Sequence, residues 1–327
     1  MDLSYTDGSR YDPEIVRFFD VAHTGAHVRA LAQYVASGAF DDLLGMSARS
    51  VIVVSESAED AAVVQMVTQA VRAECPVMVS ATLPLFVGPL DIVLIATDGS
   101  LRVEEAATAA MSEAVRRGVR TLLVQGSAAL MDESPAPVIP VPPTAGPDAN
   151  PVRLAYAISA VLQSLVFDKR VVVEELERVA DLLDEDMLAL SPERDVDINP
   201  ARQLRCAIDG SQVVHTASPE YMPAAQVIAR VWQRSGLVCF AADAKVMESL
   251  HTRIRTKKDI FYDPYVDTTE PVLGLKVVVW GVDHAPEAGF AVATYAQNCE
   301  ATSLGTLAVS ARFVVRALAA AVFECNE

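Results

Sequence analysis

The chain has 327 residues, 52% hydrophobic and 21% charged, so it can bury a substantial core and is long enough for two domains. Its formal net charge of −17 disfavours polyanions, and we expect no nucleic-acid partner. No basic segment followed by an apolar run opens the sequence, and charges or prolines interrupt the longer apolar stretches. We therefore expect no signal peptide, no membrane partner and a cytoplasmic location.

The first part of the chain alternates between helical patterns and short apolar runs. Helical spacing of apolar residues from Asp12 to Ser37 predicts one long helix, and similar patterns predict helices at 61–71 and 104–117. Apolar runs rich in β-branched residues predict buried strands at 51–57, 76–84, 91–97 and 121–127, with a further short strand at 136–142. This alternation predicts an α/β fold with a doubly wound parallel sheet.

Five prolines between Pro140 and Pro151 exclude a helix or a central strand there, and this segment is predicted to be a linker. We accordingly expect domains at 1–145 and 146–327. In the second half, helices are predicted at 152–167, 171–190, 219–233 and 286–298, and strands at 211–217, 237–242 and 276–283. The last segment, 304–323, is apolar on nearly every face and is predicted to be a buried helix.

Three stretches in this order carry a resemblance to a known family: SESA at 55–58, ATDGSL at 96–101 and IARVWQRSGLVCFAADAKV at 228–246. With the proline-rich linker, they resemble the sugar isomerase (SIS) domain, and the whole chain resembles the bifunctional phosphoglucose/phosphomannose isomerase family. The resemblance implies two SIS-like domains, aldose-ketose isomerisation of a sugar phosphate without a cofactor, and a homodimer whose sites use both subunits.

The resemblance places the ligand at two turns and at one arginine. The matching residues here are Ser55, Ser57, Thr97 and Arg153, and Ser100 with Arg102 could supply a shifted site in the second turn.

Two acidic residues depart from the pattern of these turns. Glu56 replaces a glycine, and Asp98 replaces a hydroxyl residue. Carboxylates oppose a phosphate dianion, and at ~4 Å in an intermediate dielectric the repulsion is a few kcal/mol. Binding in the family's usual phosphate position is therefore disfavoured.

Catalysis is affected as well. The family's general base falls at Ala242, which cannot transfer a proton, and no lysine follows Lys276. Glu248 and His251 share a helix face and could replace the missing groups, but a solvated helix face with a local hydrogen bond explains them better. His215 near a strand end is a further catalytic candidate or else a core histidine.

A metal site is not expected. His23 and His27 have the i, i+4 spacing of metal ligands, but no nearby cysteine or carboxylate in the sequence joins them, and helix packing accounts for both.

Three functions remain open on the sequence alone. The first is a catalytically impaired relative that binds a sugar phosphate or related metabolite. The second is an active glucose-6-phosphate/mannose-6-phosphate isomerase, and the third is a structural interaction protein that uses the acidic surface.

Overall fold

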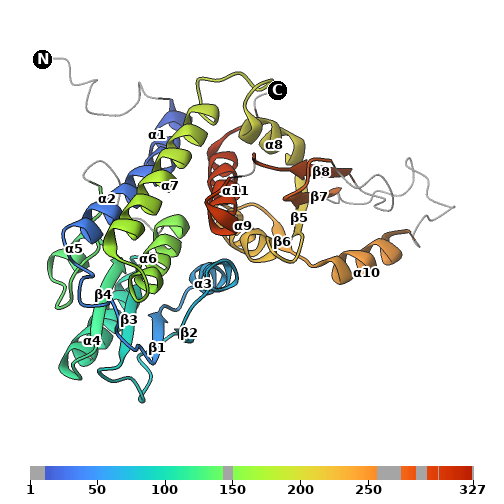
Figure 1. Ribbon diagram of the computed structural model, residues 1–327. Helices are drawn as coiled ribbons and strands as arrows, with labels where there is room; N and C mark the ends of the chain where they lie inside the picture. The colour runs from blue at the N-terminus through green and yellow to red at the C-terminus, as the bar shows by residue number, and fades with distance from the viewer. Residues whose placement is uncertain (1–11, 143–149, 256–273, 285–292, 301, 326–327) are drawn as a thin grey trace, which may run out of the picture.

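The computed structural model describes residues 12–142, 150–255, 274–284, 293–300 and 302–325, with the backbone alone for 250–255. These residues form two four-stranded parallel sheets with helices packed around them (Figure 1). The predicted α/β fold of two doubly wound parallel sheets is confirmed.

The first sheet has the strand order β2-β1-β3-β4, and all of its strands are parallel. Its register is regular until the carboxyl end, where Val54 of β1 pairs with Ile95 of β3 and Ile95 pairs with Leu123 of β4. The strands are β1 (Ser50–Val54), β2 (Val77–Ser80), β3 (Asp91–Ala96) and β4 (Arg120–Gln125). Every residue of β1 and β3 is buried, as expected for strands covered on both faces.

The second sheet repeats this topology with the order β6-β5-β7-β8, again all parallel. Its strands are β5 (Ser211–Ala217), β6 (Cys239–Ala241), β7 (Gly274–Trp280) and β8 (Ala293–Gln297). In both halves the first strand therefore occupies an interior position next to the second and third strands. The turn after that first strand leads into a helix that crosses to the second strand, α3 in one half and α9 in the other.

The described residues form helices α1 (Pro13–Ala22), α2 (Thr24–Ala36), α3 (Ala58–Ala70), α4 (Leu101–Arg116), α5 (Ala128–Asp132), α6 (Pro151–Ser164), α7 (Lys169–Ala189), α8 (Pro200–Ile208), α9 (Met222–Arg234), α10 (Ala244–Arg255) and α11 (Gly305–Val322). Several begin at the side-chain caps that the sequence offers. Asn150 and Asn199 each accept two backbone N–H bonds, and a proline follows each of them at the first helical position.

Three predicted elements were wrong. The helix at 12–37 is two helices that break at His23, where the Thr24 hydroxyl donates to Val21 O and competes with the helical bonding. The strand at 136–142 is only an isolated bridge between Val138 and Leu123, because its prolines cannot donate to a ladder. In the predicted helix at 286–298, residues 293–297 form β8 by pairing with β7, and 286–292 lie outside the described residues.

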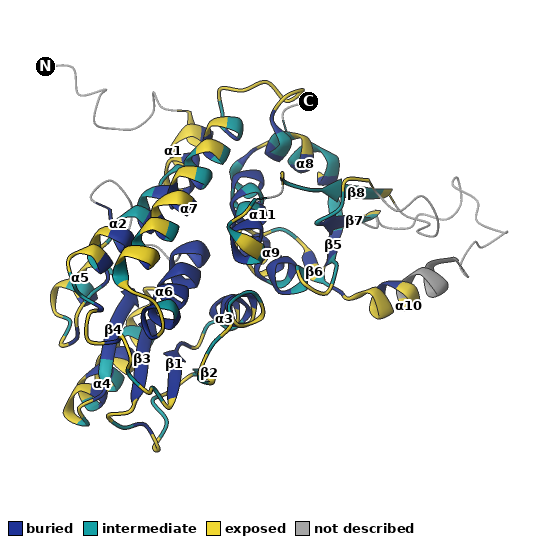
Figure 2. Cartoon of the chain, viewed as in Figure 1, coloured by how far each residue is buried: buried dark blue, intermediate teal, exposed yellow. Residues whose placement is uncertain are grey.

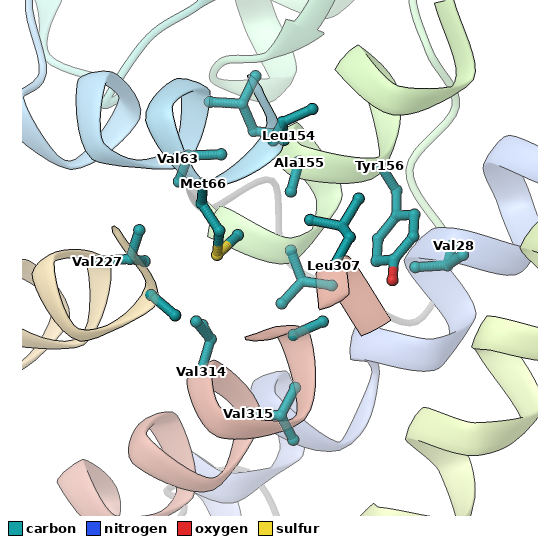
Figure 3. Close-up of a cluster of buried hydrophobic side chains, with 14 of the residues drawn as sticks. Val28, Val63, Met66, Leu154, Ala155, Tyr156, Val227, Leu307, Val314 and Val315 are labelled. Atoms are coloured by element: carbon teal, nitrogen blue, oxygen red, sulfur yellow. The ribbon is translucent and has the colours of Figure 1, made fainter. Parts of the chain in front are cut away.

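The two halves share one hydrophobic core. Figure 3 shows side chains of α3, α6, α9 and α11 gathered in one cluster, among them Val63, Met66, Val227 and Val314. The predicted buried helix near the C-terminus is confirmed, because α11 packs against α9, α8, α1 and α3 (Figure 2). Among the described helices α11 is the one long and apolar enough to cross a membrane, but 61% of it is buried inside this core, which accounts for its composition.

Helices α6 and α7 follow the proline-rich segment but pack with the N-terminal elements. Helix α7 lies along α2, and α6 packs against α3, α2 and β4. The division of the sequence at residue 145 stays a prediction.

Candidate functional site

The carboxyl ends of the first sheet bring several predicted residues to one edge. Ser55 follows β1, and its N–H donates to Ser80 O at the end of β2 (3.0 Å). Thr97 follows β3, and its N–H donates to Gln125 O at the end of β4 (3.1 Å). Ligands of open parallel sheets bind at such an edge. Ser55, Ser57, Thr97 and Ser100 all lie in the turns that follow β1 and β3.

The turn after β1 is stabilised by its own hydroxyl groups. Ser55 Oγ donates to Asp60 Oδ2 (2.6 Å) and accepts the N–H of Ser57 (3.0 Å). Ser57 Oγ caps α3 by accepting the N–H groups of Glu59 and Asp60. The acceptor positions of both serines therefore already serve the turn, and each hydroxyl keeps a structural role beside any contact with a ligand.

Two acidic residues of the first turn of α3 are buried beneath this edge. Burial raises the pKa of the Asp60 carboxyl to about 6, while the Ser55 hydroxyl acts in the opposite direction. Gln125 Nε2 lies 3.4 Å from Asp60 Oδ1, and Gln125 Oε1 has no hydrogen-bond partner in the part of the chain that the structure describes. Burial likewise raises the pKa of Glu59 to about 7, and Arg234 of α9 lowers it.

The turn after β3 holds an ionised carboxylate. Gly99 has φ +81°, and Asp98 Oδ1 accepts the Ser100 N–H (2.9 Å), which lowers the pKa of Asp98. Glu56 of the first turn is paired with the exposed Arg102 of α4 at 3.0 Å. The predicted obstacle to a phosphate dianion is thus present as two carboxylates on neighbouring turns, of which one has a cationic partner.

The turn after β4 joins the same edge through a contact that the sequence did not reveal. Glu104 of α4 accepts the Ser127 N–H (2.6 Å) and the Ser127 hydroxyl (2.8 Å), so it fastens this turn to α4. In the sequence Glu104 only opens the helix predicted at 104–117, where an acidic side chain complements the helix dipole. Asp60, Gln125 and Ser127 were also missed, because each acquires its partners by folding. One available signal was that each stands at a strand end or in the first turn of a helix.

Arg153 does not bond to any of the four hydroxyl residues. It lies on α6 with 1% of its surface exposed, and its Nη2 donates to Ile139 O (2.6 Å). Its Nε and Nη1 have no hydrogen-bond partner among the described residues, and burial lowers its pKa to about 10. Burial, followed by the charge of Arg153, lowers the pKa of the nearby His27 to about 4. Arg153 and the hydroxyl residues are therefore separate features of this half.

His215 lies inside the second half. It is fully buried on β5, its Nδ1 accepts the Trp280 indole N–H (3.2 Å), and its ring packs edge-on against Trp232. Burial lowers the pKa of His215 to about 3, so the ring is neutral. This environment is typical of a core histidine.

The other catalytic candidates lie on α10. Glu248 is exposed, and the side chain of His251 lies outside the described residues. Ala242, where the resemblance places a base, is buried in a small apolar cluster with Val214, Met247 and Val277.

A groove of about 500 Å³ lies between α3 and α9 and connects the two halves. It begins at Ala58, next to Ser57, and reaches Phe240 and Ala241 of β6. A neighbouring hollow of about 360 Å³ shares Gln65 and Gln226 with it. Among the described residues, no group of three or more histidines, cysteines or acids could hold a metal ion.

No protein-family model matches the sequence, and no curated protein matches it. Solved structures do resemble it. The C-terminal domain of glucosamine-fructose-6-phosphate aminotransferase from Francisella tularensis superposes with a TM-score of 0.55 and 10% identity, covering 97% of each chain. A candidate phosphosugar isomerase from Bacillus subtilis has a TM-score of 0.55 and 16% sequence identity, and the match covers 92% of this chain and 94% of the other. A glucose-6-phosphate isomerase-like protein from Thermus thermophilus has a TM-score of 0.50 and 15% sequence identity, and the match covers 95% of this chain and 93% of the other.

These similarities extend over nearly the whole chain and both sheets. At such low identity they establish the fold rather than an activity. The chain has the double-domain fold of the sugar isomerase (SIS) proteins, as its sequence motifs predicted.

Proposed function

We propose that this protein is a catalytically impaired relative of the phosphosugar isomerases, which binds a sugar phosphate or related sugar metabolite where the turn after β1 meets the α3–α9 groove. The similar structures named above, with their sugar-phosphate chemistry, support the ligand class. The groove supports the location, because it joins the Ser57 turn of one half to β6 of the other.

The environment of Ala242 is the main observation that supports impaired catalysis. Moving a proton between adjacent carbons needs a base within hydrogen-bond reach of the substrate. Ala242 is 4% exposed and packs among apolar side chains, so this position offers neither a carboxylate nor room for water. Asp98 and Glu56 further weaken the anchoring of a phosphate, which the reaction uses for orientation.

An active isomerase is the second candidate, and the exposed Glu248 on α10 favours it as a replacement acid or base. A coupled assay of purified protein with glucose 6-phosphate and mannose 6-phosphate separates the two. Under our proposal turnover stays far below the ~1–10³ s⁻¹ of ordinary enzymes. Turnover within that range that falls in Glu248→Gln would establish the active isomerase instead.

Binding is tested by thermal shift and calorimetry with hexose 6-phosphates, since a specific ligand stabilises the folded state by mass action. Ser57→Ala and Ser100→Ala should each weaken binding. Ser37→Ala is the matched control, because this exposed hydroxyl donates to Tyr34 O at the end of α2, away from the groove. Absence of any hexose 6-phosphate or sugar-acid binding would contradict the proposal and favour a structural interaction protein.

A further inference from the structure

The lining of the α3–α9 groove has a composition suited to one class of ligand. Small side chains keep the two helices close, and polar side chains with one aromatic ring surround the space. The lining consists of Ala58, Ala61, Ala62, Gln65, Gln226, Ala229, Arg230, Gln233, Phe240 and Ala241. A volume of about 500 Å³ lies within the ~300–1,000 Å³ typical of small-molecule sites.

Arg230 is the cation of this groove. It is exposed, and no carboxylate pairs with it among the described residues, although the chain carries 43 acidic residues against 26 basic ones. By contrast Arg234, one helical turn along α9, is paired with Glu59. A guanidinium without an acidic partner remains able to bind an anion through a pair of parallel hydrogen bonds.

Gln233 holds Arg230 in place. Its Oε1 accepts a bond from Arg230 Nη1 (3.0 Å), and its Nε2 donates to Cys239 O (2.7 Å). Both ends of this amide are therefore occupied, and they tie the guanidinium to the backbone at the start of β6. A fixed guanidinium loses less freedom on binding an anion than a free one does.

Two other amides and one ring complete the groove. Gln65 of α3 and Gln226 of α9 each offer a donor and an acceptor, which match hydroxyl groups that both donate and accept. Phe240 is 40% exposed at the end of the lining and presents an apolar surface. Amides, one cation and one aromatic ring suit a polyhydroxy ring that carries one anionic group.

We infer that the α3–α9 groove binds a monosaccharide with one anionic group, with the anion on Arg230 and the hydroxyl groups on Gln65 and Gln226. The inference rests on the proposed function and specifies where the ligand's anion binds. The anion is held by α9 of the second half rather than by the acidic turns at Glu56 and Asp98. The shared chemistry covers two sources, a sugar phosphate and a sugar acid.

The test measures calorimetric affinities of the full chain for glucose 6-phosphate, glucuronate, glucose and inorganic phosphate. Arg230→Gln removes the charge and should weaken the preferred anionic sugar about tenfold or more, with little effect on glucose. Ala61→Leu keeps a good helix former, fills the groove and should weaken every sugar. Arg170→Gln on α7 is the matched control, since it removes an exposed arginine outside the groove.

Each outcome decides between the ideas. Weaker binding of the anionic sugar in both Arg230→Gln and Ala61→Leu supports the inference. Whichever of glucose 6-phosphate and glucuronate binds wild type more tightly identifies the source of the anion. Binding that is lost in Ser57→Ala but unchanged in both groove variants keeps the proposed function and overturns the inference. Inorganic phosphate binding as tightly as the anionic sugars would overturn the role of the hydroxyl contacts. If no anionic sugar binds wild type, the proposed function and the inference both fail.

Discussion

Glu59 of α3 and Arg234 of α9 form an ion pair at 3.0 Å that links the two halves of the molecule. The carboxylate side is almost completely buried and the guanidinium side is half exposed, so the pair lies at the rim of the shared core. Removing one partner of such a pair leaves a poorly solvated charge behind. Burial also raises the pKa of Glu59 to about 7, which makes this link sensitive to pH near neutrality.

The first prediction concerns this sensitivity. Because the pKa of Glu59 is higher in the folded state, the folded state binds its proton more tightly, and its contribution to stability is lost as pH rises from about 4.5 through about 7. Glu59→Gln should therefore lose less stability than wild type between pH 6 and pH 8.5. Urea unfolding at both pH values measures the difference, and the exposed Glu105→Gln serves as control. Equal losses in wild type and Glu59→Gln would contradict it.

The second prediction uses the unpartnered amide oxygen of Gln125. In Asp60→Asn, the new side chain can still accept the Ser55 hydroxyl bond, and it can donate to Gln125 Oε1 once the Gln125 amide turns over, because Gln125 Nε2 now faces this position. It also removes a buried carboxyl whose pKa is raised to about 6, so the variant should be more stable than wild type at pH 8. Asp60→Ala leaves the Ser55 hydroxyl without its acceptor and should cost about 1–3 kcal/mol. Chemical denaturation at pH 8 checks the order, and a less stable Asp60→Asn would refute it.

The sheets could be predicted from the sequence because strands buried on both faces leave continuous apolar runs, as in β1 and β3. The strand at 293–297 could not be predicted, because a short run containing Ala, Thr and Tyr becomes a strand only through pairing with β7. The edge residues Ser57 and Ser100 could be located through the family resemblance, which places them in turns that follow strands. The partners of Asp60, Glu104 and Arg230 come from other elements or from the packed helix, so only the folded chain reveals them.

The third prediction is that the protein is a homodimer in solution. Leu85, Leu101 and Leu188 are 92%, 82% and 73% exposed, and covering such apolar side chains with a partner subunit would favour association. The resembled family also builds its sites from two subunits. Light scattering should give about twice the chain mass of 35.0 kDa at micromolar concentration. A monomer mass would remove the expectation that a partner subunit completes the site.

The last prediction concerns an attempt to restore the base by Ala242→Glu. The new carboxyl would lie among Val214, Met247 and Val277, where burial raises its pKa and keeps it protonated near neutral pH. We expect a loss of about 2–5 kcal/mol in unfolding free energy, from overpacking and from the buried polar group. We also expect no gain in isomerase turnover, because Asp98 and Glu56 still oppose a phosphate in the position that the resembled family uses. Ala242→Gln separates the effect of size from that of charge, since it should be nearly as unstable and equally inactive. Turnover that appears in Ala242→Glu but not in Ala242→Gln would mean that the missing base was the sole defect and that the substrate is still anchored productively.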